Sequence, residues 1–99
     1  MTIPDSVTRI ETSAFYGCGS LTSVMMPEGI THIGEFAFGY CNSLTSITLP
    51  QGVSSIGELA FGYCSNLKNV SLPDGVTHIG YSAFYSCSAI GELVLPEGL

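Results

Sequence analysis

The fold is decided by residues 21–43, which read LTSVMMPEGITHIGEFAFGYCNS, because every landmark of this stretch recurs at a fixed spacing. The prolines, the cysteines, an Ala-Phe pair and an isoleucine each return after 23 residues. The positions are Pro4, Pro27, Pro50, Pro73 and Pro96; Cys18, Cys41, Cys64 and Cys87; Ala14-Phe15, Ala37-Phe38, Ala60-Phe61 and Ala83-Phe84; and Ile10, Ile33, Ile56 and Ile79. Self-similarity at such a period is typical of a solenoid built from repeated coils. We therefore expect one domain over residues 1–99, with coils at about 4–26, 27–49, 50–72 and 73–95 and a partial fifth repeat at 96–99.

Each unit begins with a short alternation of apolar and polar residues, as in Leu44, Ile47 and Leu49. This pattern predicts brief strands with one buried face at Thr22–Met26, Thr45–Leu49, Lys68–Leu72 and Glu92–Leu95. The proline after each strand has no N–H to donate, so it ends the pairing there. Since one coil cannot bury its own apolar side chains, the strands are expected to stack about 4.8 Å apart in one parallel sheet.

The second half of each unit returns the chain to the start of the next strand. Ile30 and Ile33 are predicted to point inward after the proline turn. The stretch Glu35 to Tyr40 is predicted to form one short helical turn that carries Ala37 and Phe38 into the core.

These residues resemble the BspA-type leucine-rich repeats, whose units read much like I-P-x-x-V-T-x-I-G-x-x-A-F-x-x-C-x-x-L-x-x-V. The stretch from Pro27 to Gly34, with Ala37-Phe38 and Cys41, fits that line nearly position for position. The resemblance implies an α/β repeat solenoid. It would be a right-handed leucine-rich-repeat coil with a short parallel β-sheet on its concave face and short helical turns on its convex side.

Two departures from that pattern need a structural explanation. The glycine column of Gly34, Gly57 and Gly80 holds Glu11 in the first coil, so this position either tolerates a side chain or is distorted there. The tyrosine near each cysteine also moves by one position: the chain reads Tyr16-Gly17 and Tyr85-Ser86 in the outer coils, but Gly39-Tyr40 and Gly62-Tyr63 in the inner ones.

The four cysteines are predicted to form a buried ladder of free thiols. Equivalent side chains of adjacent coils are parallel and about 4.8 Å apart, whereas a disulfide needs converging Cβ atoms about 3.8 Å apart. No C-x-x-C pair for zinc is present. His32 and His78 share a column two coils apart with Ser55 between them, so we expect solvated histidines and no metal site.

The composition excludes several classes of function. Eight Asp and Glu residues face only Arg9 and Lys68, which gives a net charge of −6 and argues against nucleic-acid or anionic-membrane partners. No apolar stretch approaches the roughly 20 residues of a membrane span, and the N-terminus lacks the features of a secretion signal. No arrangement of catalytic residues is recognisable, so we expect no enzyme and no cofactor. The acidic column of Asp5, Glu28, Gln51, Asp74 and Glu97 is expected to be a solvated edge, with calcium binding left open as the alternative.

The outer face of the strands is the candidate binding surface, because small polar side chains on a rigid sheet make an accessible platform for a protein. Its predicted contact residues are Ser23, Met25, Ser46, Thr48, Lys68, Asn69, Ser71, Glu92 and Val94. By the resemblance, we expect a protein-interaction module from an extracellular or cell-surface adhesin that binds a host or matrix protein. The alternative is a structural spacer or idealised repeat scaffold without a ligand of its own. Self-association through uncapped terminal coils is also expected.

Overall fold

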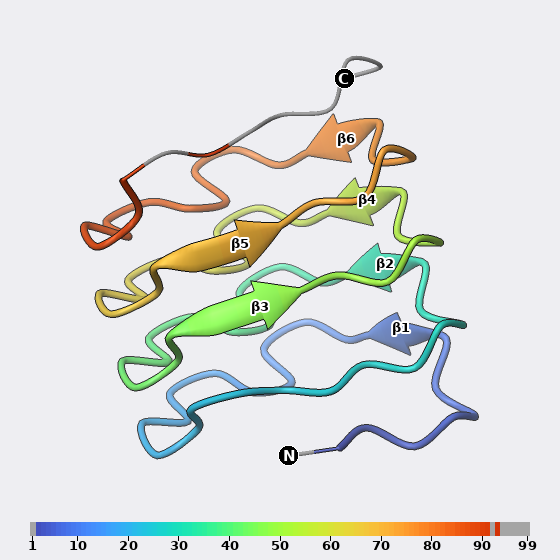
Figure 1. The fold of residues 1–99 in the computed structure, drawn as a ribbon, viewed down its shortest axis with the longest axis horizontal. Helices are drawn as coiled ribbons and strands as arrows, with labels where there is room; N and C mark the ends of the chain where they lie inside the picture. The colour runs from blue at the N-terminus through green and yellow to red at the C-terminus, as the bar shows by residue number, and fades with distance from the viewer. Residues whose placement is uncertain (1, 92, 94–99) are drawn as a thin grey trace.

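The protein is a stack of coils in which each turn of the chain lies directly on the one before (Figure 1). The computed structural model describes residues 2–91 and 93. Each coil has a front run, a turn, and a back run that leads to the next front run (Figure 1). The 23-residue spacing sets the register: Ile33 pairs with Ile56, and Ile47 pairs with Val70. Equivalent residues therefore lie side by side in adjacent coils, as the repeat predicts.

The front run carries the predicted parallel strands, although they are shorter than predicted. Strand β3 is Ser46–Thr48 and strand β5 is Asn69–Ser71, and the two pair in parallel. The first coil contributes only a parallel bridge between Thr2 and Met25. Alternation works as expected in β3, where Ile47 is buried between exposed neighbours. Of the predicted fourth strand, Glu92–Leu95, only Leu93 is among the described residues.

A second sheet on the back run was not predicted. It contains β1 (Arg9–Ile10), β2 (His32–Ile33), β4 (Ser55–Ile56) and β6 (His78–Ile79), which pair in parallel in the order β1-β2-β4-β6. Each of these strands has two residues, too few to show an alternating pattern in the sequence. The inward position predicted for Ile33 is correct, and the residue lies in β2.

The predicted helical turn at Glu35 to Tyr40 is wrong, and the described residues contain no helix. Backbone N–H groups here alternate between two partners. Phe36, Phe38 and Tyr40 donate to carbonyls of the next coil, at Glu58, Ala60 and Gly62 (3.1, 2.8 and 2.8 Å). The intervening residues close turns within their own coil, as Ala37 does to the Gly34 carbonyl. An α-helix would need every N–H to bond four residues back, so bonding between coils replaces the helix.

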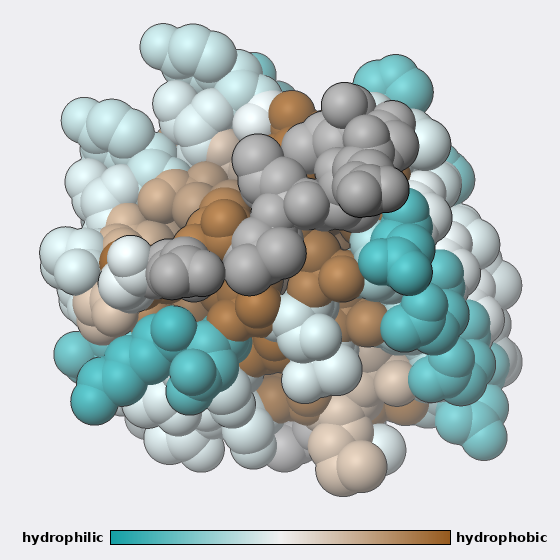
Figure 2. Space-filling view, turned by 45° about the horizontal axis from the view of Figure 1, so that its top comes forward, coloured by the Kyte–Doolittle hydropathy of each residue, from teal (hydrophilic) through white to brown (hydrophobic). Residues whose placement is uncertain are grey.

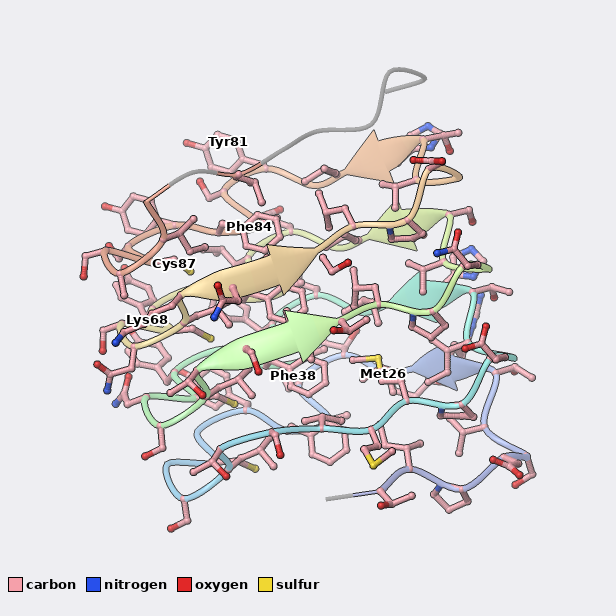
Figure 3. The ribbon with its side chains drawn as sticks, in the orientation of Figure 1. Met26, Phe38, Lys68, Tyr81, Phe84 and Cys87 are labelled. Carbon is pink, nitrogen blue, oxygen red and sulfur yellow. The ribbon has the colours of Figure 1, made fainter. Side chains whose placement is uncertain are left out.

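The core lies between the front and back runs, where Phe38 and Phe84 appear in Figure 3. One phenylalanine from each coil enters it, and the rings stack at centroid distances of 5.1, 5.3 and 5.3 Å in the order Phe15, Phe38, Phe61 and Phe84. Phe38 and Phe61 are fully buried, as are the alanines that precede them. Seen partly from the C-terminal end, apolar residues fill the centre and a polar column follows the edge formed by the front-to-back turns (Figure 2).

The glycine column exists because adjacent coils touch there. A Cβ atom added to Gly34 would lie 2.7 Å from backbone atoms of Glu11, and one added to Gly57 would lie 2.6 Å from the backbone nitrogen of Glu35. Real Cβ atoms do not approach backbone that closely, so each of these positions needs glycine. Glu11 lies in the first described coil, so the described residues show no equivalent contact for its side chain.

Candidate functional site

The predicted binding surface is a continuous exposed face on the front run; we call it the strand face. All of its described members have exposed side chains: Ser23, Met25, Ser46, Thr48, Lys68, Asn69 and Ser71. Met25 is the largest apolar group on it and is 69% exposed. The parallel pairing aligns Ser46 with Asn69 and Thr48 with Ser71. Two further predicted members, Glu92 and Val94, lie outside the described residues.

Two open depressions follow the strand face. One, of about 370 Å³, is lined by Ser23, Met25, Ser46 and Thr48 together with neighbouring residues of the first two coils. The other, of about 200 Å³, lies along β3 and β5 and includes Lys68 and Asn69. Small-molecule sites usually enclose most of their ligand, which open depressions of small polar side chains do not. The geometry suits a broad contact with a macromolecule.

The cysteines are free thiols, as predicted. Cys41, Cys64 and Cys87 are buried, whereas Cys18 in the first coil is partly exposed. Each buried thiol donates to the carbonyl of a phenylalanine in the preceding coil, such as Cys64 Sγ to Phe38 O at 3.0 Å. Burial raises the pKa of Cys41, and interaction with the neighbouring Cys87 thiol together with burial raises the pKa of Cys64, while the same interaction lowers the pKa of Cys87. Cys41 and Cys64 are therefore held in their unreactive protonated form.

The histidines and acidic residues do not assemble into a site within the described part of the chain. His32 and His78 both pair with Ser55, one on each side, which confirms that they lie two coils apart. The Nδ1 atoms of these histidines lie 2.8 Å and 3.0 Å from the hydroxyls of Thr31 and Thr77. Among residues 2–91 and 93, no group of three or more His, Cys, Asp or Glu side chains converges on a point that could hold a metal ion. The calcium alternative for the acidic column therefore gains no support from the described residues.

A row of tyrosines lies at the surface just before the cysteines of successive coils. The sequence did not predict this row as a surface feature. We call Tyr16, Tyr40, Tyr63 and Tyr85 the tyrosine ridge. Tyr40 and Tyr63 stack at 4.4 Å, and each also meets an outer tyrosine edge to face at 5.4 Å. Tyr16 and Tyr85 are 51% and 52% exposed. The sequence shows one tyrosine per coil near this corner, but their shift by one position hid the continuity.

The size of an earlier side chain in the same coil accounts for the shift in steric terms. A Cβ atom on Gly39 would lie 2.8 Å from Phe36 Cδ1, and one on Gly62 would lie 3.0 Å from Leu59 Cδ2. In the outer coils the residue three positions earlier is a small serine, Ser13 or Ser82, and a tyrosine fits. A large side chain at the earlier position therefore moves the tyrosine one residue onward, to a position with positive φ (59° at Tyr40). The ridge stays continuous because both arrangements bring a ring to the same corner.

Comparison with known proteins identifies this architecture. Residues 1–99 match the BspA type leucine rich repeat region in six copies. The chain belongs to the BspA-type leucine-rich repeat family. Among solved structures, the T. pallidum leucine-rich repeat protein has a TM-score of 0.97 and 34% sequence identity over 100% of this chain and 49% of its own. A Bacteroides ovatus leucine-rich repeat protein has a TM-score of 0.90 and 39% identity over 93% of this chain and 24% of its own.

A Faecalibacterium prausnitzii protein described as a leucine rich cell surface protein matches less closely, with a TM-score of 0.69 and 32% identity over 92% of this chain and 30% of its own. The BspA-type chain thus spans about half of the T. pallidum protein and about a quarter of the Bacteroides ovatus protein. No curated protein sequence matches it. Repeats of the leucine-rich type are generally protein-interaction modules. Within the described residues, no helix has the length and apolar character of a membrane span.

Proposed function

We propose that this BspA-type solenoid is a protein-binding segment of a cell-surface adhesin, and that it binds a host or matrix protein through the strand face. The observation that carries the proposal is the alignment of exposed small polar side chains on the paired strands β3 and β5. The similar Faecalibacterium prausnitzii protein is described as a cell surface protein, which supports this location.

The strand face favours a weak contact that gains strength from repetition. Apart from Met25, its side chains are small or polar, and it lacks the tryptophan, tyrosine and arginine anchors that dominate tight interfaces. A longer solenoid, or several copies on one surface, would raise the effective affinity without any new kind of contact. A structural spacer without a ligand is the alternative.

The test is binding of bead-displayed protein to immobilised collagen, laminin and fibronectin, which serve as matrix-protein probes. We compare the unchanged chain with the strand-face variant Thr48→Arg and with Thr12→Arg, an equal charge change at an exposed position of the back run. The strand face is supported if the unchanged chain binds one of the three probes, Thr48→Arg weakens that binding, and Thr12→Arg leaves it intact.

A variant of the tyrosine ridge, Tyr16→Ser with Tyr85→Ser, tests the competing surface. If this variant abolishes binding and Thr48→Arg does not, the strand face is not the contact surface. A protein-binding role would still stand. Absence of binding to all three probes at bead-level valency would favour the spacer.

A further inference from the structure

Tyr40 and Tyr63 are the most closely associated of the five tyrosines. Their ring centroids are 4.4 Å apart and the ring planes differ by 9°, so the two phenols lie face to face. They belong to neighbouring coils and occupy the same repeat position. Tyr40 is 38% exposed, and Tyr63 is partly exposed, so a solvent-borne oxidant can reach the pair.

We propose that Tyr40 and Tyr63 form a covalent modification site, at which oxidation by a haem peroxidase with hydrogen peroxide joins two coils through dityrosine. Each phenol loses one electron and its hydroxyl proton and becomes a tyrosyl radical. A carbon–carbon bond forms between the two ring carbons next to the hydroxyls, and the two hydrogens on those carbons move to the oxygens as the rings regain aromaticity. One hydrogen peroxide accepts the two electrons and two protons and leaves as two waters.

The stacked geometry selects this pair over its neighbours. Coupling needs the ring carbons of both radicals to meet, and a stacked pair 4.4 Å apart brings the faces of the two rings close together. Tyr16 with Tyr40, and Tyr63 with Tyr85, lie at 5.4 Å with ring planes 68° and 76° apart, so an edge meets a face and the rings share little area. The selectivity therefore comes from the solenoid register.

Such a bond would restrain two successive coils. Tyr40 and Tyr63 are one repeat apart, so the bond closes one repeat of chain into a loop in the unfolded state. Closing a loop lowers the conformational entropy of the unfolded chain more than that of the folded one, which stabilises the fold. In a surface protein exposed to peroxide, oxidation at the tyrosine ridge would therefore stabilise the fold.

The test oxidises dilute, folded protein with a haem peroxidase and hydrogen peroxide and follows dityrosine fluorescence. The product is then digested in denaturant with a protease that cleaves after glutamate. Cleavage at Glu35 and Glu58 leaves Tyr40 in peptide 36–58 and Tyr63 in a separate peptide beginning at residue 59. We expect one intramolecular cross-link, located by tandem mass spectrometry at Tyr40 and Tyr63, and an upward shift of the urea midpoint.

The variants keep the rings and remove only the hydroxyl. Tyr40→Phe is expected to lose the cross-link, whereas Tyr81→Phe is expected to retain it, although Tyr81 is the most exposed tyrosine at 81%. Oxidation in urea is expected to abolish the preference for the pair. A dominant cross-link through Tyr81 or between chains, an unchanged yield in Tyr40→Phe, or the same product from unfolded protein would overturn the proposal.

Discussion

Individual residues in this protein are fixed mainly by their neighbours one repeat away. Phe38 packs between Phe15 and Phe61, and the thiol of Cys64 donates to the carbonyl of Phe38. Such columns could be predicted from the sequence because they repeat without variation. Their partners could not, because the sequence does not show which atoms of adjacent coils meet.

Truncating a phenylalanine of the stack is expected to be the most damaging single change. Phe38→Ala removes a fully buried ring with neighbours on both sides, and the loss should be about 3–5 kcal/mol of unfolding free energy. Thr48→Ala, at an exposed position of the strand face, should change it by about 0.5 kcal/mol or less. Urea unfolding of both variants measures the difference, and equal midpoints would refute the core assignment.

The buried cysteines are expected to resist thiol reagents until the protein unfolds. The pKa values of Cys41 and Cys64 are raised, so the reactive thiolate form of these two residues is scarce in the folded state. Because the folded-state pKa of Cys41 is raised, this thiol ionises first in the unfolded chain, so its contribution to stability should be lost as pH rises above about 8.5. Native protein should label at Cys18 first, and four thiols should label in denaturant. Fast labelling of Cys41 in native protein at neutral pH would contradict this account.

At the scale of elements, the sequence predicted the front strands and missed the back sheet and the turns. The alternation around Ile47 is long enough to be recognised, whereas β2 and β4 have two residues each. The stretch Phe36 to Tyr40 contains good candidates for a helical turn, but φ is 54° at Phe36 and 59° at Tyr40. Those values belong to the left-handed region, which a right-handed helix excludes. Hydrogen bonds to the next coil compensate for the strain, and local sequence patterns contain no information about them.

The coupling between Phe36 and Gly39 can be tested by a double-mutant cycle. Gly39→Ala places a Cβ atom 2.8 Å from Phe36 Cδ1 and should cost about 1–3 kcal/mol of stability. In the background of Phe36→Ser the same change should cost clearly less, because that contact is gone, with a coupling of about 0.5 kcal/mol or more.

Gly29→Ala is the matched control, since its nearest contact would be an ordinary 3.8 Å to the Val7 carbonyl. Its effect should be the same with Phe36 or serine at position 36. Additive free energies for Gly39→Ala and Phe36→Ser would show that the steric account of the tyrosine shift is wrong.

At the scale of the whole molecule, the stack has an apolar end at the first coil. Ile3, Val7, Ala14 and Phe15 line a largely apolar hollow there. The self-association expected from the sequence stays a prediction, and this apolar surface is where we expect it to occur. However, the close contact between coils at the glycine column limits how a second chain could stack on this end. If a second chain stacked in register on this end, its backbone would approach the Glu11 side chain. The backbone of Glu11 approaches position 34 in the same way, and only a glycine fits there.

Self-association is therefore expected to be weak in the unchanged chain and stronger in Glu11→Gly, which restores a glycine at the contact. The net charge of −6 opposes association, so added salt should promote it by screening. Sedimentation across protein and salt concentrations measures both effects. Monomers throughout, for both chains and up to the highest salt, would contradict the proposal.

The central claim is that residues one repeat apart lie side by side in parallel register. Isotope-edited nuclear Overhauser spectroscopy tests it most directly, because it reports proximity between named protons in solution. We expect cross-peaks between Ile47 and Val70, between Ile33 and Ile56, and between the rings of Phe38 and Phe61. Antiparallel cross-peaks, or a helical series of contacts from Glu35 to Tyr40 in place of contacts to the next coil, would contradict it.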